Sequence, residues 1–270
     1  MNNLKRYRVK PGKKVKLKDW DPADKSAAPG GGEEDAGALA KLAARLDELQ
    51  DVLYAQHKHK ILLVLQGMDS SGKDGTIRHV FNEVDPLGVR VASFVAPTKE
   101  ELDRDYLWRV HKAVPGKGEI VIFNRSHYED VLVVRVHEWI DAAEVQRRFK
   151  QINAFEKLLA ETGTIIIKCF LYISKAEQKR RLEARLSDAT KQWKFRVGDL
   201  EERKHWDKYM AAYADVLNNT STTWAPWYVI PADSKSNRNL LISRILVEAL
   251  EGLKMKYPKP EENLDGIVVK

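Results

Sequence analysis

Residues 59–76, HKILLVLQGMDSSGKDGT, decide the fold of this chain. The apolar run ILLVL leads into a glycine loop, which is typical of a strand buried on both faces of a parallel sheet. Gly67, Gly72 and Lys73 follow the spacing of a phosphate-binding loop, and a helix is expected over residues 74–85. Backbone N–H groups in such a loop converge on one point, where the helix N-terminus adds partial positive charge. The stretch therefore predicts an anion site, with a tight turn beside a surface lysine as the alternative.

Two carboxylates accompany this loop, Asp69 inside it and Asp74 where a hydroxyl usually helps to hold magnesium. A carboxylate repels phosphate unless a divalent cation lies between them, and Mg²⁺ prefers hard oxygen ligands shared with water and phosphate. We expect Asp69 to be a Mg²⁺ ligand, whereas Asp74 also fits a first-turn acid stabilised by the helix dipole. The loop residues expected to bind phosphate are Gly67, Ser70, Ser71, Gly72, Lys73, Asp74 and Gly75.

Outside this stretch, short apolar runs alternate with helical patterns. The further strands expected are 88–94, 118–124, 164–173 and 226–232, and the further helices are 36–56, 98–113, 141–161, 175–187, 199–219 and 236–256. This alternation indicates an α/β fold with a five-stranded parallel sheet covered by helices.

The third of these five strands ends in a polar segment, FNRSHYED (123–130). Ligands of parallel α/β sheets bind outside the carboxyl ends of the strands, so we expect this segment to face the glycine loop. Arg125 is suited to fork onto phosphate oxygens, and Glu129 and Asp130 supply two more carboxylates unless they are solvated surface charges. His127 is given no chemical role, because a structural hydrogen bond fits it equally well.

Residues 180–209 read as helix, basic turn, helix. This arrangement is typical of a lid that closes over a phosphoryl-transfer site and places cations there. The alternative is a solvated, charged helix pair. The residues of this segment expected to contact phosphate are Arg185, Lys191, Lys194 and Arg203.

The charge of the chain is concentrated at one end. Residues 1–18 hold eight of the 46 Lys and Arg residues and no acid, so the other 38 face 39 acidic residues. This basic arm is expected to be solvated or to pack in an oligomer, and the alternative is a surface that attracts a polyanion. Residues 19–35 are expected to form an irregular linker, and residues 259–270 a polar surface tail.

The composition also bears on location. No run of 18 apolar residues is present, so no membrane span is expected. Cys169 is the single cysteine, which excludes an internal disulfide and fits a reducing cytoplasm.

Three motifs together resemble the family 2 polyphosphate kinases: GMDSSGKDGT, FNRSHYED and KQWKFRVGDLEERKHWDKY. The resemblance covers about residues 30–258. It implies a thymidylate kinase-like P-loop kinase, a three-layer sandwich over residues 36–258 with a helical lid at about 180–209. It also implies transfer of phosphate between inorganic polyphosphate and AMP, ADP or ATP with Mg²⁺, in a homo-oligomer, either a dimer or a tetramer.

Carried over by motif position, the resemblance makes Asp69 a magnesium ligand, Lys73 and Arg125 phosphate-binding residues, and Asp130 an acid of the same site. The catalytic set expected is Asp69, Lys73, Arg125, Glu129 and Asp130, with Asp69 and Asp130 as the metal ligands. Asn124 stands where the common version of the family has Asp. Asn124 with Glu129 resembles the subgroup that phosphorylates both AMP and ADP.

The nucleotide is expected to bind after the second strand, where Phe94 and Arg109 are candidates to contact the base. Asn124 and Glu129 complete the expected nucleotide-binding set. Two rival functions stay open: an ATP-dependent nucleoside monophosphate kinase, and a non-catalytic protein that binds polyphosphate or nucleic acid. Asp74 in place of Ser or Thr argues against the first, and the retention of Lys73 argues against the second.

Overall fold

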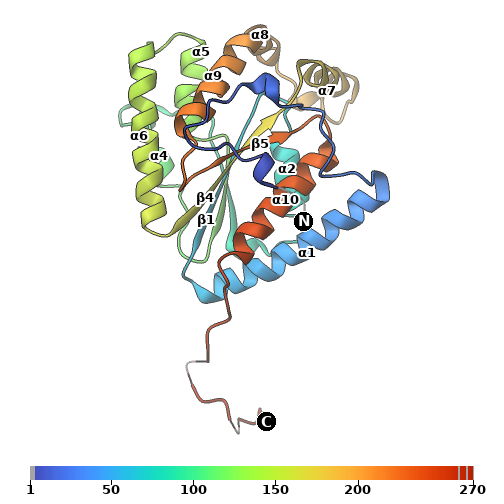
Figure 1. Cartoon of the computed structure of the whole chain (residues 1–270), viewed down its shortest axis with the longest axis vertical. Helices are drawn as coiled ribbons and strands as arrows, with labels where there is room; N and C mark the ends of the chain where they lie inside the picture. Colours follow the sequence, from blue (N-terminus) through green and yellow to red (C-terminus); the bar gives the residue numbers. More distant parts are fainter. Residues whose placement is uncertain (1–3, 261, 266, 270) are drawn as a thin grey trace.

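The computed structural model describes residues 4–260, 262–265 and 267–269, and a parallel sheet forms its centre (Figure 1). The strands are ordered β2-β3-β1-β4-β5, and every pairing is parallel. Their bounds are β1 Lys60–Gln66, β2 Val89–Ser93, β3 Ile120–Asn124, β4 Thr164–Tyr172 and β5 Trp227–Pro231. Residues 61–65 of β1 are all fully buried, as expected of a strand covered on both faces. The predicted α/β fold is confirmed.

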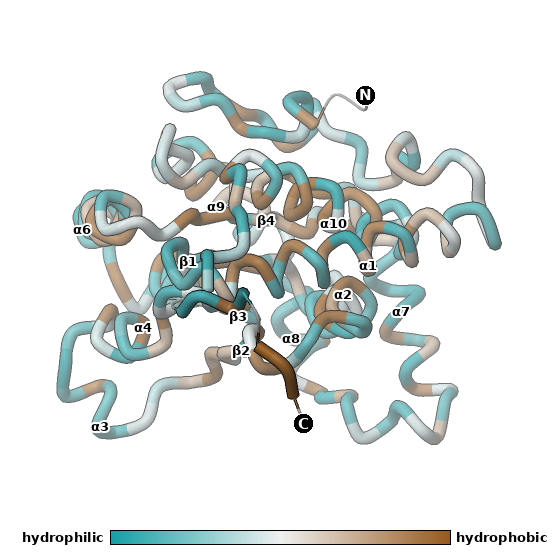
Figure 2. Tube along the Cα trace, turned by 90° about the horizontal axis from the view of Figure 1, so that it is seen from below, coloured by the Kyte–Doolittle hydropathy of each residue, from teal (hydrophilic) through white to brown (hydrophobic). Residues whose placement is uncertain are grey.

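Helices cover both faces of this sheet, which gives three layers (Figures 1 and 2). One layer consists of α1 Gly32–Gln56, α2 Lys73–Val80 and α10 Lys235–Glu251; the other contains α5 Val133–Val136, α6 Ala142–Glu161 and α9 Trp206–Thr220. The remaining helices are α3 Lys99–Leu102, α4 Trp108–His111, α7 Lys175–Ser187 and α8 Gly198–Lys204, and there are short 3-10 turns that include η4 His127–Val131. Among the described residues, no helix combines the length and the apolar character needed to span a bilayer.

Two of the predicted helices are divided in the structure, and the helices expected over 74–85 and 236–256 end early, at Val80 and Glu251. The helix expected over 98–113 is two short helices, because Asp105 accepts a hydrogen bond from the N–H of Leu107 at 2.9 Å and so stabilises a turn between them. The helix expected over 199–219 is divided into α8 and α9 at His205. This break allows Trp206 to enter the core at the start of α9.

The basic arm is not solvated along its whole length, which corrects the expectation from its composition. Leu4, Tyr7, Val9 and Leu17 are buried. The N–H of Val9 donates to the carbonyl of Trp227 at 2.8 Å, and the N–H of Val229 donates to the carbonyl of Tyr7 at 2.9 Å. The arm therefore covers the outer edge of β5, which would otherwise expose unpaired backbone groups.

The turn between β1 and α2 requires glycine at both ends. Gly67 has φ 157°, and a Cβ there would lie 2.8 Å from the carbonyl oxygen of Leu171. Gly72 has φ 107°, and its Cβ would lie 1.9 Å from Nη1 of Arg238. Backbone and a buried guanidinium thus approach the loop too closely for any side chain.

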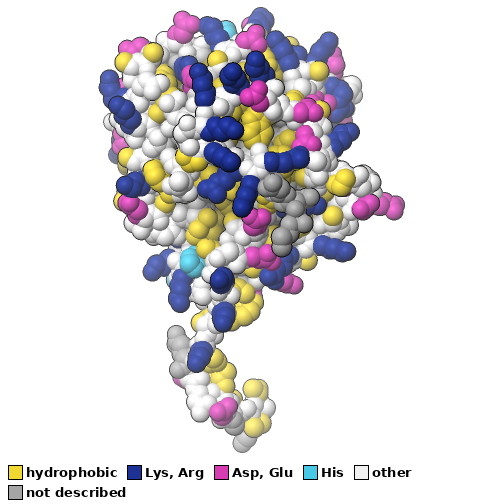
Figure 3. All heavy atoms as spheres, in the orientation of Figure 1, with side chains coloured by type: hydrophobic (Ala, Val, Ile, Leu, Met, Phe, Trp, Pro, Cys, Tyr) yellow, Lys and Arg dark blue, Asp and Glu magenta, His cyan; other side chains and the backbone are white. Residues whose placement is uncertain are grey.

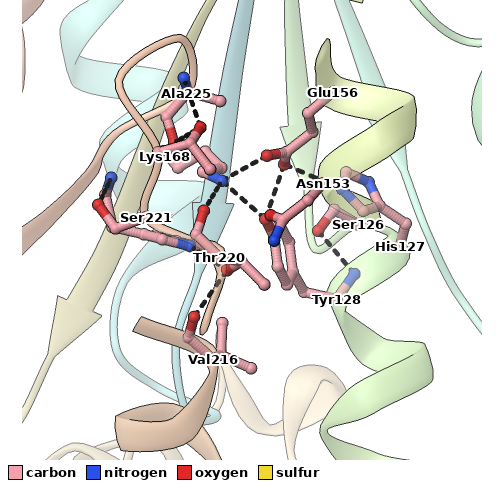
Figure 4. A network of polar contacts seen from close by, with 12 residues as sticks. Ser126, His127, Tyr128, Asn153, Glu156, Lys168, Val216, Thr220, Ser221 and Ala225 are labelled. Carbon is pink, nitrogen blue, oxygen red and sulfur yellow. Dashed lines mark hydrogen bonds and ion pairs between the residues drawn. The ribbon is translucent and has the colours of Figure 1, made fainter. Parts of the chain in front are cut away.

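A buried ion pair joins Lys168 on β4 to Glu156 on α6 (Figure 4). Nζ of Lys168 donates to Oε2 of Glu156 at 2.5 Å, to the hydroxyl of Tyr128 at 2.8 Å and to the carbonyl of Thr220 at 2.8 Å. The Tyr128 hydroxyl donates to Oε1 of Glu156 at 2.7 Å, and Nε2 of His127 lies 3.3 Å from the same oxygen. Burial opposes ionisation of Glu156, but Lys168 and His127 hold its pKa below the ordinary value. The structural role considered for His127 is confirmed.

We predict that Lys168→Met destabilises the protein by about 3–5 kcal/mol, because it leaves the Glu156 carboxylate buried without its cation. Urea unfolding measures the change. Lys157→Met is the matched control, since Lys157 and Glu161 form an exposed pair on α6 whose loss costs less than about 0.5 kcal/mol. Adding Glu156→Leu to Lys168→Met should recover most of the lost stability. Equal losses for Lys168→Met and Lys157→Met would contradict the prediction.

The glycine turn gives a second prediction. Gly72→Ala should destabilise the protein by more than about 1 kcal/mol, because alanine resists a positive φ and its Cβ meets Arg238. Gly37→Ala is the control: Gly37 lies inside α1 with no atom within 4 Å of the added Cβ, so this change should stabilise by roughly 0.5–1 kcal/mol. Thermal and urea unfolding of the two variants should move in opposite directions.

Candidate active site

The glycine loop and the polar end of β3 lie side by side at the carboxyl edge of the sheet. Leu65 pairs in register with Asn124, and the N–H of Arg125 donates to the carbonyl of Leu65 at 3.1 Å. Arg125 has φ 63°, so the chain turns sharply as the strand ends. The residues that follow β1 and β3 therefore meet, as the sequence predicts.

The lysine of the loop holds its first two carbonyl groups. Nζ of Lys73 donates to the oxygen of Gly67 at 2.7 Å and lies 3.4 Å from the oxygen of Met68. Burial lowers the pKa of Lys73, while the charge of Asp69 opposes that shift. Lys73 therefore contacts the glycine loop, as its position in the sequence motif predicts.

The next carbonyl groups are held by side chains from α7 and α10. Gln178 donates to the oxygen of Asp69 at 3.0 Å. Nη1 of Arg181 donates to the oxygens of Ser70 at 3.0 Å and Ser71 at 3.1 Å, and Nη2 of Arg181 donates to the carbonyls of Ala232 and Asp233.

Arg238 adds a further donor to the same loop. Its Nη1 lies 3.3 Å from the oxygen of Ser71, and burial together with the charge of Arg181 lowers the pKa of Arg238 to about 9. The carbonyls of residues 67–71 thus accept hydrogen bonds from cationic and amide side chains. The first N–H groups of α2 lack intrahelical partners and stay available to an anion.

Two of the predicted catalytic residues form an ion pair beside this loop. Nη2 of Arg125 donates to Oδ1 of Asp69 at 2.8 Å, and both side chains are partly exposed. Glu129 lies close to this pair: burial raises its pKa, and the charges of Arg125 and Lys73 oppose the rise. Asp69, Lys73, Arg125 and Glu129 therefore share one cluster of charges.

Asn124 and Asp74 contact each other. Nδ2 of Asn124 donates to Oδ1 of Asp74 at 2.9 Å, which ties the end of β3 to the first turn of α2. Asp74 thus occupies the first-turn position expected of a helix-stabilising acid. Contacts of Asn124 with a nucleotide, and of Asp74 with phosphate, stay predictions.

Asp130 faces a different group of residues. Its Oδ1 lies 3.7 Å from Nη1 of Arg148, and its buried Oδ2 has no hydrogen-bond partner in the part of the chain that the structure describes. Burial raises the pKa of Asp130 to about 6, against the charges of Arg109 and Arg148. The structure thus places Asp130 beside Arg148 and within reach of the charge of Arg109 from the predicted nucleotide site, and its role as a metal ligand stays a prediction.

The two other predicted nucleotide contacts lie together after β2. The guanidinium of Arg109 lies 5.5 Å from the centre of the Phe94 ring, and its Nη1 donates to the carbonyl of Val95 at 2.9 Å. Phe94 is 7% exposed and packs edge-on against Phe123 at 4.8 Å. Both side chains are largely covered by the protein, and base contacts by either residue stay predictions.

The cationic side chains of the predicted lid have different partners. Arg203 donates to Oε1 of Gln178 at 2.7 Å, so it supports the amide that holds the loop. Arg185 lies 3.5 Å from Asp199 on α8. Lys191 pairs with Asp188, and Lys194 lies 4.8 Å over the ring of Trp193; the structure brings neither of these lysines to the glycine loop.

Sequence reasoning missed three contributors to the site. Gln178 and Arg238 carry no motif, and they reach the loop only because α7 and α10 fold back onto it. Arg181 lies four residues before Arg185 in the segment predicted to be a lid, but in the structure it contacts the glycine loop. Asp199 is also near: burial and the charge of Asp69 raise its pKa.

A resident metal would have few protein ligands here. Among residues 4–260, 262–265 and 267–269, no three His, Cys, Asp or Glu side chains are grouped to hold an ion. Mg²⁺ commonly takes only one or two carboxylates and completes its shell with water and phosphate oxygens. Asp69 fits this kind of shared site, as do the buried hydroxyl oxygens of Ser70 and Ser71, which have no hydrogen-bond partner among the described residues.

Comparison with known proteins agrees with this geometry. The family described as Polyphosphate kinase 2 matches residues 31–258. The chain is 57% identical over 266 residues to the AMP/ADP-polyphosphate phosphotransferase of Meiothermus ruber, covering 98% of this chain and 100% of that protein. It is 42% identical to the ADP-polyphosphate phosphotransferase of Rhodopseudomonas palustris, over 94% of this chain and 92% of the relative.

The fold is also similar to a solved structure. The crystal structure of Polyphosphate Kinase 2 from Arthrobacter aurescens TC1 superposes with a TM-score of 0.90 at 45% identity, over 96% of this chain and 92% of that one. The glycine loop with its carboxylate and arginine lies within the matched region. The chain belongs to the polyphosphate kinase 2 family.

Proposed function

We propose that this enzyme transfers the terminal phosphoryl group of inorganic polyphosphate to ADP and to AMP, so that ATP is formed. The main support for the proposal is the hydrogen bond from Arg125 to Asp69. This pair lies beside a glycine loop whose carbonyl oxygens already accept hydrogen bonds from Lys73 and Arg181. The relatives named for AMP/ADP and ADP transfer support the two acceptors. Acceptance of AMP as well as ADP rests on the match to the Meiothermus ruber protein and on Glu129.

The loop and its neighbours are suited to hold the phosphate groups. The free N–H groups at the start of α2, with Lys73 and Arg125, attract the anionic oxygens. Mg²⁺, bound by Asp69 and by phosphate oxygens, would neutralise charge on the group being transferred. Charge neutralisation matters here, because two unit charges at ~4 Å repel by roughly 4 kcal/mol at an effective dielectric of 20.

The acceptor would enter from the side of β2 and β3. Arg109 and Arg148 supply positive charge on that side, and the charges of both arginines and of Glu129 act on Asp130. In-line transfer then breaks the terminal P–O bond of the polyphosphate and forms a bond from the same phosphorus to an oxygen of the nucleotide phosphate. Alignment and charge neutralisation supply most of the catalysis in such reactions.

Other features of the proposal concern the whole molecule. We propose that the segment from α7 to α8 closes over the bound phosphates as a lid, which its helix–turn–helix form supports. We also propose that the protein forms a homo-oligomer, either a dimer or a tetramer, and that it is located in the cytoplasm. The buried, unpaired Cys169 is compatible with a reducing compartment.

One assay tests the proposed function. Purified protein with Mg²⁺, ADP and polyphosphate should form ATP, and omission of either polyphosphate or Mg²⁺ should abolish it. AMP in place of ADP should yield ADP and then ATP. An ATP-dependent nucleoside monophosphate kinase would need ATP as donor, and a non-catalytic binding protein would form no product, so either result would overturn the proposal.

We expect Asp69→Asn to lower kcat by roughly 10²–10³, because the variant would lose the carboxylate that holds the Mg²⁺ needed to neutralise charge in the transition state. The Mg²⁺ concentration for half-maximal activity should rise in the same variant. Asp103→Asn is the matched control, because Asp103 is an exposed acid outside the site. Both variants should keep the wild-type unfolding temperature. Wild-type kcat and Mg²⁺ dependence in Asp69→Asn would refute the ligand role.

A further inference from the structure

The basic arm, defined here as residues 4–18, presents its charges on one side. Its apolar side chains, Leu4, Tyr7, Val9 and Leu17, are buried against the body of the protein. All of its Lys and Arg residues are exposed: Lys5, Arg6, Arg8, Lys10, Lys13, Lys14, Lys16 and Lys18. The arm is therefore packed on the protein through its apolar side chains. Its basic side chains form a positively charged surface.

Several backbone contacts fix this surface in place. Besides the pairing with β5, the hydroxyl of Ser221 donates to the carbonyl of Val9 at 2.8 Å. The side chain of Asn218 bonds both the N–H and the carbonyl of Val15, at 2.6 and 3.2 Å. The arm is therefore ordered before any ligand arrives, so that binding to it does not have to order a flexible tail.

Most of these cations have no acidic partner. Within the described residues, Arg6 pairs with Asp24, and no ion pair involves the other seven Lys and Arg residues of the arm. Figure 3 shows Lys and Arg side chains gathered over the part of the face that the arm crosses in Figure 1. Like charges placed together repel one another, so the arrangement is favourable when a polyanion neutralises it.

The residues that follow the arm reach the edge of the sheet that carries the glycine loop. The N–H of Asp233 donates to the carbonyl of Pro22 at 3.1 Å, just beyond the arm. The carbonyl of Asp233 accepts from Arg181, which in turn holds the carbonyl of Ser70. The chain that directly follows the arm is therefore linked to the glycine loop through Asp233 and Arg181.

We propose that the basic arm is a second binding surface for polyphosphate, which holds the part of a long chain that lies away from the reacting end. This inference rests on the proposed function, because it takes the donor of that reaction as the ligand. Polyphosphate fits better than other polyanions, since it is the donor of the proposed reaction and it carries a charge on every unit. Long chains should therefore bind more tightly than short ones.

The test compares two triple variants of equal charge. The arm variant is Lys10→Gln, Lys13→Gln and Lys14→Gln, whose side chains are exposed. The control variant is Lys58→Gln, Lys117→Gln and Lys150→Gln, which are equally exposed and lie outside the arm. Both remove three positive charges, so a difference between them reports position rather than net charge.

The arm variant should raise the KM for long-chain polyphosphate about tenfold, and the slope of log KM against log salt should fall by about two. Its kcat, its KM for ADP and its KM for tripolyphosphate should match the wild type. The control variant should match the wild type throughout. Equal effects of the two variants, or an equal rise in KM for tripolyphosphate, would overturn the inference.

Two further outcomes separate this inference from the proposed function. If the wild type forms no ATP from polyphosphate, the proposed function fails. If it forms ATP but the arm variant is unchanged, only the role of the arm fails. A direct binding measurement with single-stranded RNA completes the design: if the arm variant loses RNA binding but keeps its affinity for long polyphosphate, the arm is a nucleic-acid surface and the inference is wrong.

Discussion

The glycine loop depends on donors that lie behind it. A loop that offers its N–H groups to an anion leaves its carbonyl oxygens to be satisfied elsewhere, and buried carbonyls without partners are costly. Lys73, Gln178, Arg181 and Arg238 satisfy them here from three different helices. The helices are thereby fixed relative to the loop, and the loop is fixed in the shape that binds phosphate.

The buried ion pair gives the same kind of support to the other half of the site. Tyr128 and His127 are held by Lys168 and Glu156, and they lie in the chain between Arg125 and Glu129. Apolar residues would stabilise such a position as well or better. A network with fixed hydrogen-bond directions, however, orients the neighbouring charged side chains, which an apolar contact does not do.

The sequence predicted the parts of the structure that depend on local pattern. The five strands, the loop from Gly67 to Lys73, and the meeting of Asp69 with Arg125 follow from apolar runs, glycine spacing and the parallel sheet rule. Arg238 and Gln178 could not be predicted, because their contacts join segments far apart in the chain. The helical pattern over 98–113 is interrupted by the hydrogen bond of Asp105, and the pattern over 199–219 is interrupted at His205, where Trp206 packs into the core. Neither cause changes the spacing of apolar residues, so the pattern could not predict these breaks.

The pairing of the arm with β5 also has a consequence for how the chain is made. Val9 and Ser221 are hydrogen-bonded although 212 positions separate them. During synthesis the arm leaves the ribosome long before its partner strand exists, so its apolar side chains stay uncovered until translation is nearly finished. Such long-range closure is slow, because the entropy of a large loop is lost before the contact forms. The exposed lysines and arginines on the same segment would meanwhile keep it from associating with other nascent chains.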